Sequence, residues 1–314
     1  MNTLRYQLGL MTLMLAAVVN GTAFAQQAPN ANGNPVRMIV TVEPRKGSEV
    51  PVVNREDVMV YEGKNRDQVT AWVPAQGDQA GLEFFVLIDD GASSALDTQL
   101  RDIKNFISAL PPTAKVGVAY MQNGIAQIER NLTSDHDLAA KAVRLPLGYF
   151  AASASPYFSL SDLVKRWQPD GNRREVLMVT NGVDPYYGTG DTFDPYLASA
   201  IEDSQRAGIL VSSIYAPGGG HFGHSYWLNY WGQIYLAKLT EETGGEGYYI
   251  GFTGPAPDFS PYLRDATDRL NHQYLLTFLA KPQKKNGLQP VKLRTELHNV
   301  DLVSASRVYV PGAQ

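Results

Sequence analysis

The most constraining feature of this sequence is an unbroken apolar run that ends in two carboxylates. Residues 84–88 are Phe-Phe-Val-Leu-Ile, and Asp89, Asp90 and Gly91 follow directly. A strand with one solvated face would alternate apolar and polar residues, so this run predicts a strand covered on both faces, as in a parallel sheet between helices. Ligands of open α/β sheets bind at the carboxyl ends of the strands, which makes Asp89 a candidate site residue.

The same pattern returns twice further along the chain. Residues 175–180 and 209–215 are again mostly apolar, and each segment is followed by a polar or glycine-rich loop. Between these segments, apolar residues recur at helical spacing, for example over 96–110. Strands and helices that alternate in this way over 81–271 predict an α/β domain with a doubly wound, mostly parallel sheet.

Both ends of the chain predict strands without helices. Near the N-terminus these strands cover 36–42, 57–62 and 69–73, and near the C-terminus they cover 273–279, 290–297 and 304–310. We expect residues 36–80 and 272–314 to pair into one small β module, with the α/β domain of residues 81–271 inserted between its halves.

The first residues predict a signal peptide rather than a part of the fold. Arg5 is followed by an apolar stretch over 8–19, and Ala23-Phe24-Ala25 offers the small residues that a signal peptidase recognises. We expect cleavage after Ala25, a flexible lead-in over 26–35, and export to the periplasm or the extracellular space. The alternative is a buried N-terminal helix. No stretch of the mature chain is long and apolar enough to predict a membrane span.

Composition narrows the class of protein further. The chain of 314 residues has no cysteine, so an exported form would depend on its core rather than on disulfides. The net charge of −4 gives no reason to expect a nucleic-acid partner or an anionic membrane partner.

Three short segments add to the order of these features. Residues 57–64 are Asp-Val-Met-Val-Tyr-Glu-Gly-Lys, residues 240–245 are Thr-Glu-Glu-Thr-Gly-Gly, and residues 274–278 are Tyr-Leu-Leu-Thr-Phe. The order of features resembles the von Willebrand factor type A (VWFA) fold. More narrowly, the three segments are similar to the D-F-x-V-x-E-D-G segment, the A-x-x-T-G-G helix end and the Y-x-L-x-Y strand of the VWFA-related (acidobacterial-type) family of secreted bacterial proteins. The resemblance covers most of the mature chain.

The resemblance implies a metal-ion-dependent adhesion site, built from D-x-S-x-S after the first strand, a Thr in a second loop and an Asp after a later strand. Such residues suit Mg²⁺, which takes oxygen ligands in near-octahedral geometry. Asp89 and Ser93 match the first motif, but Gly91 replaces its middle serine and Asn181 stands where the later Asp is expected. An aromatic residue occupies the Thr position. We therefore expect a degenerate site without a cofactor; the alternative is a remodelled Mg²⁺ or Ca²⁺ site at Asp89, Ser93 and Asp184.

The loops expected at the carboxyl ends of the strands are rich in aromatic residues and histidine. Exposed Tyr and Trp residues combine contact area with a polar group, the composition of anchors in protein interfaces. One interpretation is a contact surface for a protein partner, and the other is that the rings pack on one another and close the end of the domain. The candidate contact residues are Tyr157, Tyr186, Tyr187, His221, Tyr226 and Trp227.

Enzyme and zinc hypotheses have less support in the sequence. His221 and His224 lie three residues apart, but no third ligand follows at a zinc-binding spacing. G-x-S-x-G, H-E-x-x-H and G-x-x-x-x-G-K motifs are absent, and a triad of Ser93, Asp184 and a loop histidine requires a free choice among residues. We predict a non-enzymatic protein-binding or scaffolding module, with metal-dependent cell adhesion as the alternative.

Overall fold

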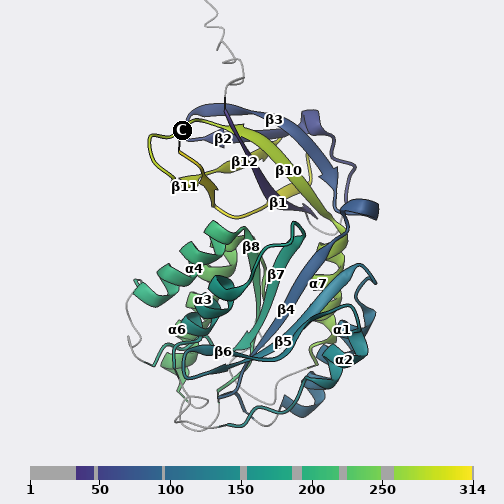
Figure 1. The fold of residues 1–314 in the computed structure, drawn as a ribbon, viewed down its shortest axis with the longest axis vertical. Helices are drawn as coiled ribbons and strands as arrows, with labels where there is room; N and C mark the ends of the chain where they lie inside the picture. The colour runs from purple at the N-terminus through teal and green to yellow at the C-terminus, as the bar shows by residue number, and fades with distance from the viewer. Residues whose placement is uncertain are drawn as a thin grey trace, which may run out of the picture.

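The computed structural model describes residues 33–45, 49–93, 96–148, 154–185, 193–218, 225–248 and 258–312. These residues form an α/β part and a β part, which lie one above the other in Figure 1. The predicted signal peptide over 1–25 and most of the lead-in lie outside the described residues. Within them, no helix is long and apolar enough to cross a membrane.

The α/β part is built on a six-stranded sheet in the order β6-β5-β4-β7-β8-β9. All neighbouring strands are parallel except β6, which runs antiparallel to β5 at one edge. From β4 the chain adds β5 on one side and β7, β8 and β9 on the other, so the predicted α/β, doubly wound sheet is confirmed. The strands are β4 (Leu82–Asp89), β5 (Ala114–Gln122), β6 (Ile125–Thr133), β7 (Arg173–Thr180), β8 (Ile209–Tyr215) and β9 (Gly247–Tyr248).

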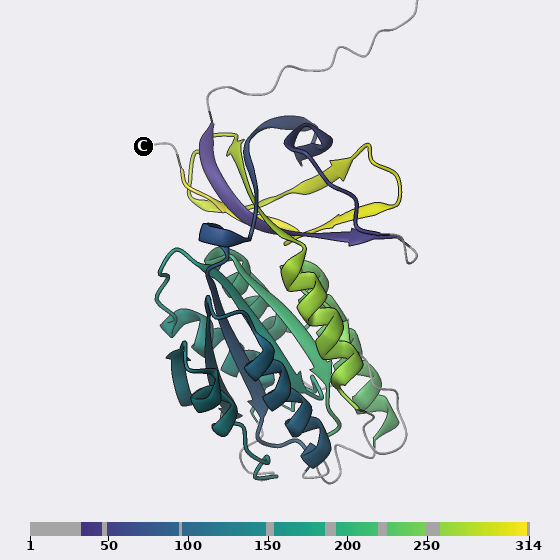
Figure 2. The ribbon, with the colours of Figure 1, turned by 90° about the vertical axis from the view of Figure 1, so that its right-hand side faces the viewer.

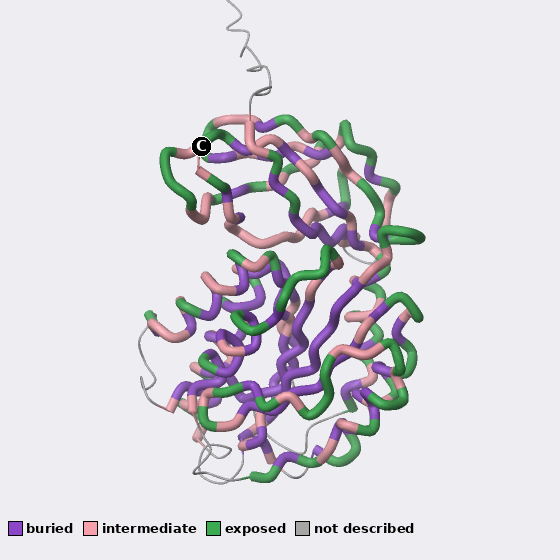
Figure 3. Tube along the Cα trace, viewed as in Figure 1, coloured by how far each residue is buried: buried purple, intermediate pink, exposed green. Residues whose placement is uncertain are grey.

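Helices cover both faces of this sheet, which explains the unbroken apolar run. Phe84, Val86 and Ile88 pack with helices on one face, and Phe85 and Leu87 pack with helices on the other. Figures 2 and 3 show these layers and the buried strands between them. The first face carries α1 (Asp97–Ala109), α2 (His136–Lys141) and α7 (Ser260–Asn271); the second carries α3 (Pro156–Arg166), α4 (Pro195–Ala207) and α6 (Tyr226–Thr243).

The β part joins strands from the two ends of the chain in one antiparallel sheet of order β12-β2-β3-β10-β1-β13. Its core is largely aliphatic, with Val40, Val60 and Phe278 fully buried. A separate pair, β11 and β14, packs beside it. The elements are β1 (Asn34–Pro44), η1 (Arg55–Asp57), β2 (Val58–Glu62), β3 (Asn65–Pro74), η2 (Gly77–Gln79), β10 (Gln273–Ala280), β11 (Gly287–Pro290), β12 (Lys292–Thr295), β13 (Val300–Val303) and β14 (Arg307–Val310).

Buried polar contacts join the two parts at the amino ends of the sheet strands. Arg173 at the start of β7 donates to the side chain of Gln273 at the start of β10. Gln273 in turn donates to Glu175 over 2.6 Å. Because all three side chains are buried, each depends on the others for hydrogen bonds that water would otherwise supply. The β part therefore lies at the end of the sheet opposite the carboxyl ends of its strands.

The Thr-Gly-Gly segment at the end of α6 has a packing reason. Thr243 donates its hydroxyl to Leu239 of its own helix over 2.8 Å and lies 3.3 Å from the backbone of Val211. Gly244 ends the helix at φ 81°, and a Cβ on it would lie 2.5 Å from the backbone of Ser304. A Cβ on Gly245 would lie 2.0 Å from the Val211 carbonyl oxygen. The segment ends α6 where it meets both β8 and the C-terminal strands.

The ends of three elements have local reasons. Helix α3 begins at Pro156, because proline is well suited to the first turn of a helix. Helix α2 is capped by Asp135, which accepts from the Leu138 amide over 3.0 Å. Strand β6 extends to Thr133, whose hydroxyl accepts from the Asp135 amide over 3.0 Å.

Candidate functional site

The candidate site lies at the carboxyl ends of β4 and β7, where the winding of the sheet changes direction. Thr180 at the end of β7 donates its hydroxyl to Asp89 Oδ2 over 2.8 Å, and the Gly91 amide donates to Asp89 Oδ1 over 2.8 Å. Burial raises the pKa of Asp89, and these two hydrogen bonds oppose the increase. Asp89 therefore joins two strand ends and shapes the turn after β4.

Asp90 is held by an arginine from a distant loop. Arg144 donates Nη1 to Asp90 Oδ1 over 2.7 Å and Nη2 to Oδ2 over 3.0 Å, in a bidentate ion pair. The Leu147 amide and the Gln122 side chain donate to the same carboxylate. Burial acts to raise the pKa of Asp90, but the hydrogen bonds from Arg144, Gln122 and Leu147 outweigh it and hold the pKa below its usual value.

Tyr120 supports the other side of this ion pair. The Arg144 guanidinium lies 3.8 Å from the centre of the Tyr120 ring, a cation–π contact. The Tyr120 hydroxyl donates to the Arg144 carbonyl over 2.9 Å and accepts from the Arg144 amide over 2.6 Å. The loop of residues 144–148 is therefore tied to β4 and β5, and it presents Leu145 and Leu147 to solvent.

The carboxylates at this position are already engaged by groups of the chain itself. Asp89 accepts two hydrogen bonds, and Asp90 is neutralised by a guanidinium. Asn181 accepts from the Val183 amide over 2.9 Å through the oxygen that a metal would need. Within the described ranges, no group of three or more acidic or histidine side chains is placed to hold a metal ion. Asp184 lies in the same region but is 1% exposed.

Tyr157 is not a contact residue, contrary to the expectation from sequence. Its side chain is fully buried under the end of the sheet. The hydroxyl donates to the Gly182 carbonyl over 2.7 Å, and the ring packs edge-on against Tyr235 at 6.4 Å between centroids. Helix α3 begins just before Tyr157 and turns this ring inward, so no partner can reach it.

A chain of rings leads from this buried tyrosine pair to the surface of α6. Tyr235 contacts Trp231, which contacts Trp227 and Tyr230 at centroid distances of 5.8 and 6.0 Å. Trp227 is 54% exposed and Tyr230 is 41% exposed. The exposed rings therefore rest on rings that are held by the core, which limits their freedom before any contact is made.

Exposed apolar side chains gather at this end of the molecule. Among the described residues, eleven large hydrophobic side chains are exposed, and only Val52, Val73 and Leu138 lie elsewhere. The other eight surround the carboxyl ends of the sheet strands, and we call them the strand-end face. They are Ile125, Leu145, Leu147, Phe158, Phe193, Tyr226, Trp227 and Tyr230.

The sequence-predicted contact residues divide into three groups. Tyr226 and Trp227 are exposed on the strand-end face. Tyr157 is buried, and Tyr186, Tyr187 and His221 lie outside the described residues. The sequence does not predict Leu145 and Leu147 as contact residues. Their exposure depends on the ion pair between Arg144 and Asp90, which are far apart in the chain and share no local motif.

Comparison with known proteins gives weak structural likeness. No family model matches the sequence, and no curated protein matches it. An aerotolerance-related membrane protein from Bacteroides fragilis is 15% identical over 61% of this chain and 99% of its own, with a TM-score of 0.45. BatB from Bacteroides thetaiotaomicron is 17% identical over 60% of this chain and 97% of its own, with a TM-score of 0.44.

A third similar structure is the proximal thread matrix protein 1 of the mussel byssus with a zinc-occupied MIDAS motif. It is 13% identical over 65% of this chain and 48% of its own, with a TM-score of 0.46. Because all three TM-scores are below 0.5, these likenesses carry no argument about function. The α/β fold is established by the strand order described above.

Proposed function

We propose that this protein is an exported, non-enzymatic binding or scaffolding module of VWFA type that contacts a protein partner through its strand-end face. The observation that carries the proposal is the concentration of exposed apolar side chains at that face, eight of the eleven in the described part of the chain. Large exposed apolar patches on soluble proteins mark interaction sites. Export is supported by the signal-peptide pattern of the first 25 residues.

The proposed anchors have the properties of interface hot spots. Trp227 and Tyr230 are large, partly exposed and packed against Trp231, which continues into the buried Tyr235. Such rings lose little conformational entropy on binding, and truncation of a hot-spot residue costs about 2 kcal/mol or more of binding free energy. Leu145 and Leu147 extend the same surface on a loop held by the Asp90–Arg144 ion pair.

The proposal includes contact without a metal ion. The Arg144 guanidinium neutralises the Asp90 carboxylate, which is next to Asp89 in the chain. A divalent cation would therefore have to compete with the positive charge of this arginine. The alternative, metal-dependent adhesion through Asp89, Ser93 and Asp184, requires Asp89 to release its hydrogen bonds with Thr180 and Gly91.

The test uses the wild-type chain and a Trp227→Ala/Tyr230→Ala variant as baits. Each bait is incubated with the exported protein fraction of the producing cells, and the captured proteins are compared. The matched control is Val52→Ala, which removes an exposed apolar side chain from the β part. We expect the double variant to lose a specific partner that the wild-type chain and the control retain. A chelator in a parallel capture should leave binding unchanged.

Two results would contradict the proposal. Equal capture by the wild-type and Trp227→Ala/Tyr230→Ala proteins, with both shown to be folded by circular dichroism, would remove the strand-end face as the contact surface. Loss of capture on chelation, with restoration by Mg²⁺ or Ca²⁺, would favour metal-dependent adhesion instead.

A further inference from the structure

Strand β1 has an edge that is only partly paired. On one side it pairs with β10 over residues 34–41. On the other side β13 pairs only with residues 41–44. Among the described residues, no strand pairs with residues 34–40 on that second side. A strand edge without a neighbour presents backbone N–H and C=O groups that another extended chain can pair with.

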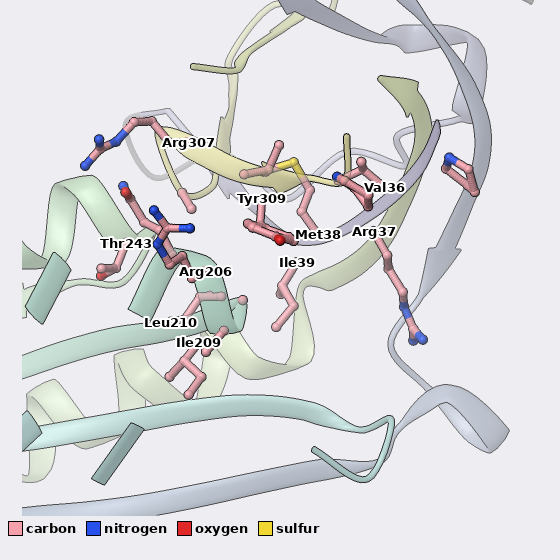
Figure 4. Close-up of a pocket in the computed structure, with 17 residues that line it drawn as sticks. Val36, Arg37, Met38, Ile39, Arg206, Ile209, Leu210, Thr243, Arg307 and Tyr309 are labelled. Carbon is pink, nitrogen blue, oxygen red and sulfur yellow. The ribbon is translucent and has the colours of Figure 1, made fainter. Parts of the chain in front are cut away.

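A cavity of about 250 Å³ lies along this edge, between the β part and the α/β part (Figure 4). Its walls come from β1, the end of α4, the start of β8, and β14. Met38, Ile39 and Leu210 supply an apolar surface, and the Tyr309 ring lies between Met38 and Arg206 (Figure 4). Cavities with apolar walls and a few polar groups are typical of binding sites.

The charged residues that line this cavity are all arginines, although the protein as a whole is acidic. Arg206 pairs with Glu202 one turn earlier in α4 and lies 5.9 Å from the centre of the Tyr309 ring. Arg37 and Arg307 have no ion pair with any described residue. Figure 4 shows their side chains extending on opposite sides of the cavity, so a ligand along the edge would meet a cation on each side.

We propose that this cavity binds an extended acidic peptide segment, which adds as a strand to the open edge of β1. The peptide backbone would supply hydrogen bonds to β1, its apolar side chains would contact Met38 and Tyr309, and its carboxylates would pair with Arg37 and Arg307. Pro35 lacks an N–H group, so pairing is confined to the residues after it. The site lies at the amino ends of the sheet strands, opposite the strand-end face, and does not depend on that face.

The test measures fluorescence polarisation of a labelled short peptide of alternating Glu and Val, titrated with the full chain. Two comparison peptides replace every Glu by Lys or carry N-methyl groups on alternate residues. The protein variant is Arg37→Gln/Arg307→Gln, and the matched control is Arg294→Gln, an exposed arginine on β12. Neither Arg37 nor Arg307 has a described carboxylate partner, so the variant is expected to fold, which thermal melting checks.

We expect the acidic peptide to bind and the Lys and N-methylated peptides to fail. The double variant should bind about tenfold more weakly, a loss that two partly exposed ion pairs account for. The Arg294→Gln and Trp227→Ala/Tyr230→Ala proteins should bind like the wild type. Three results would each overturn the proposal: no binding of the acidic peptide, unchanged affinity in the arginine double variant, or equal binding of the N-methylated peptide.

Discussion

The Asp90–Arg144 ion pair predicts a large and pH-dependent loss of stability when the arginine is replaced. The Asp90 side chain is 2% exposed and that of Arg144 is 32% exposed. In Arg144→Met the carboxylate keeps only its hydrogen bonds from Leu147 and Gln122 and loses both guanidinium bonds. An uncompensated buried charge costs about 3–5 kcal/mol, and partial exposure of the arginine reduces our expectation to about 3 kcal/mol at pH 7.

The sign of the pH dependence follows from the pKa of Asp90. Because its folded pKa is held below the unfolded value, the pair stabilises the protein above the unfolded pKa, and this contribution is lost as pH falls through the folded pKa. In Arg144→Met the buried carboxyl can protonate without losing an ion pair. The difference in free energy of unfolding between the wild type and the variant should therefore narrow below about pH 4.

The assay is urea unfolding of wild type, Asp90→Asn, Arg144→Met and the double variant at several pH values. Arg55→Met is the control, because Arg55 and its partner Glu56 are both more than half exposed. It should lose about 0.5 kcal/mol or less. The reasoning is wrong if Arg144→Met lowers the free energy of unfolding by less than about 1 kcal/mol. It is also wrong if the effects of Asp90→Asn and Arg144→Met simply add in the double variant, which would mean no coupling between the two residues.

Three further predictions concern other parts of the chain. Gly244→Ala should lower the free energy of unfolding by about 3 kcal/mol, because its φ is positive and the new Cβ would overlap the backbone. Gly208 also has a positive φ but open space around it, so Gly208→Ala should cost only about 1 kcal/mol. Equal losses for the two variants in urea unfolding would refute the packing argument. Tyr157→Phe should cost about 1 kcal/mol of stability, measured by thermal melting, and leave partner capture unchanged; impaired capture by a folded variant would contradict its burial. Burial, together with the nearby Glu62, raises the pKa of Asp67 to about 7, so stability should fall as pH rises from about 4 towards 7. Asp67→Asn should remove that decrease. If the variant's stability depends on pH as the wild type's does, Asp67 is not the cause.

The strand-end face shows how far sequence patterns reach. The apolar run of residues 84–88 and the helical spacing that follows it predict buried strands and amphipathic helices, because these patterns are local. The position of the candidate site also follows, since parallel strands bring their carboxyl ends to one edge of the sheet. For this reason the sequence predicts Tyr226 and Trp227 at that edge, and both side chains are exposed in the described part of the chain.

Other features depended on residues far apart in the chain. Thr180 donates to Asp89 across 91 positions, and Arg144 pairs with Asp90 across 54. No local sequence pattern predicts either contact, because each depends on how distant segments meet at the end of the sheet. The burial of Tyr157 is of the same kind: composition places an aromatic residue in the loop, but the start of α3 decides which way it points.

By itself, the sequence determined the alternating architecture, the position of the strand ends and the stop at Gly244-Gly245. Periodicity, helix-terminating residues and strand composition act over a few residues, so they can be read without knowing which distant segments meet. Only the tertiary structure decided that a guanidinium faces Asp90, that Tyr157 is inside and Trp227 outside, and that the edge of β1 is left open beside a cavity. These outcomes depend on contacts between residues far apart in the chain, and such contacts exist only in the folded tertiary structure.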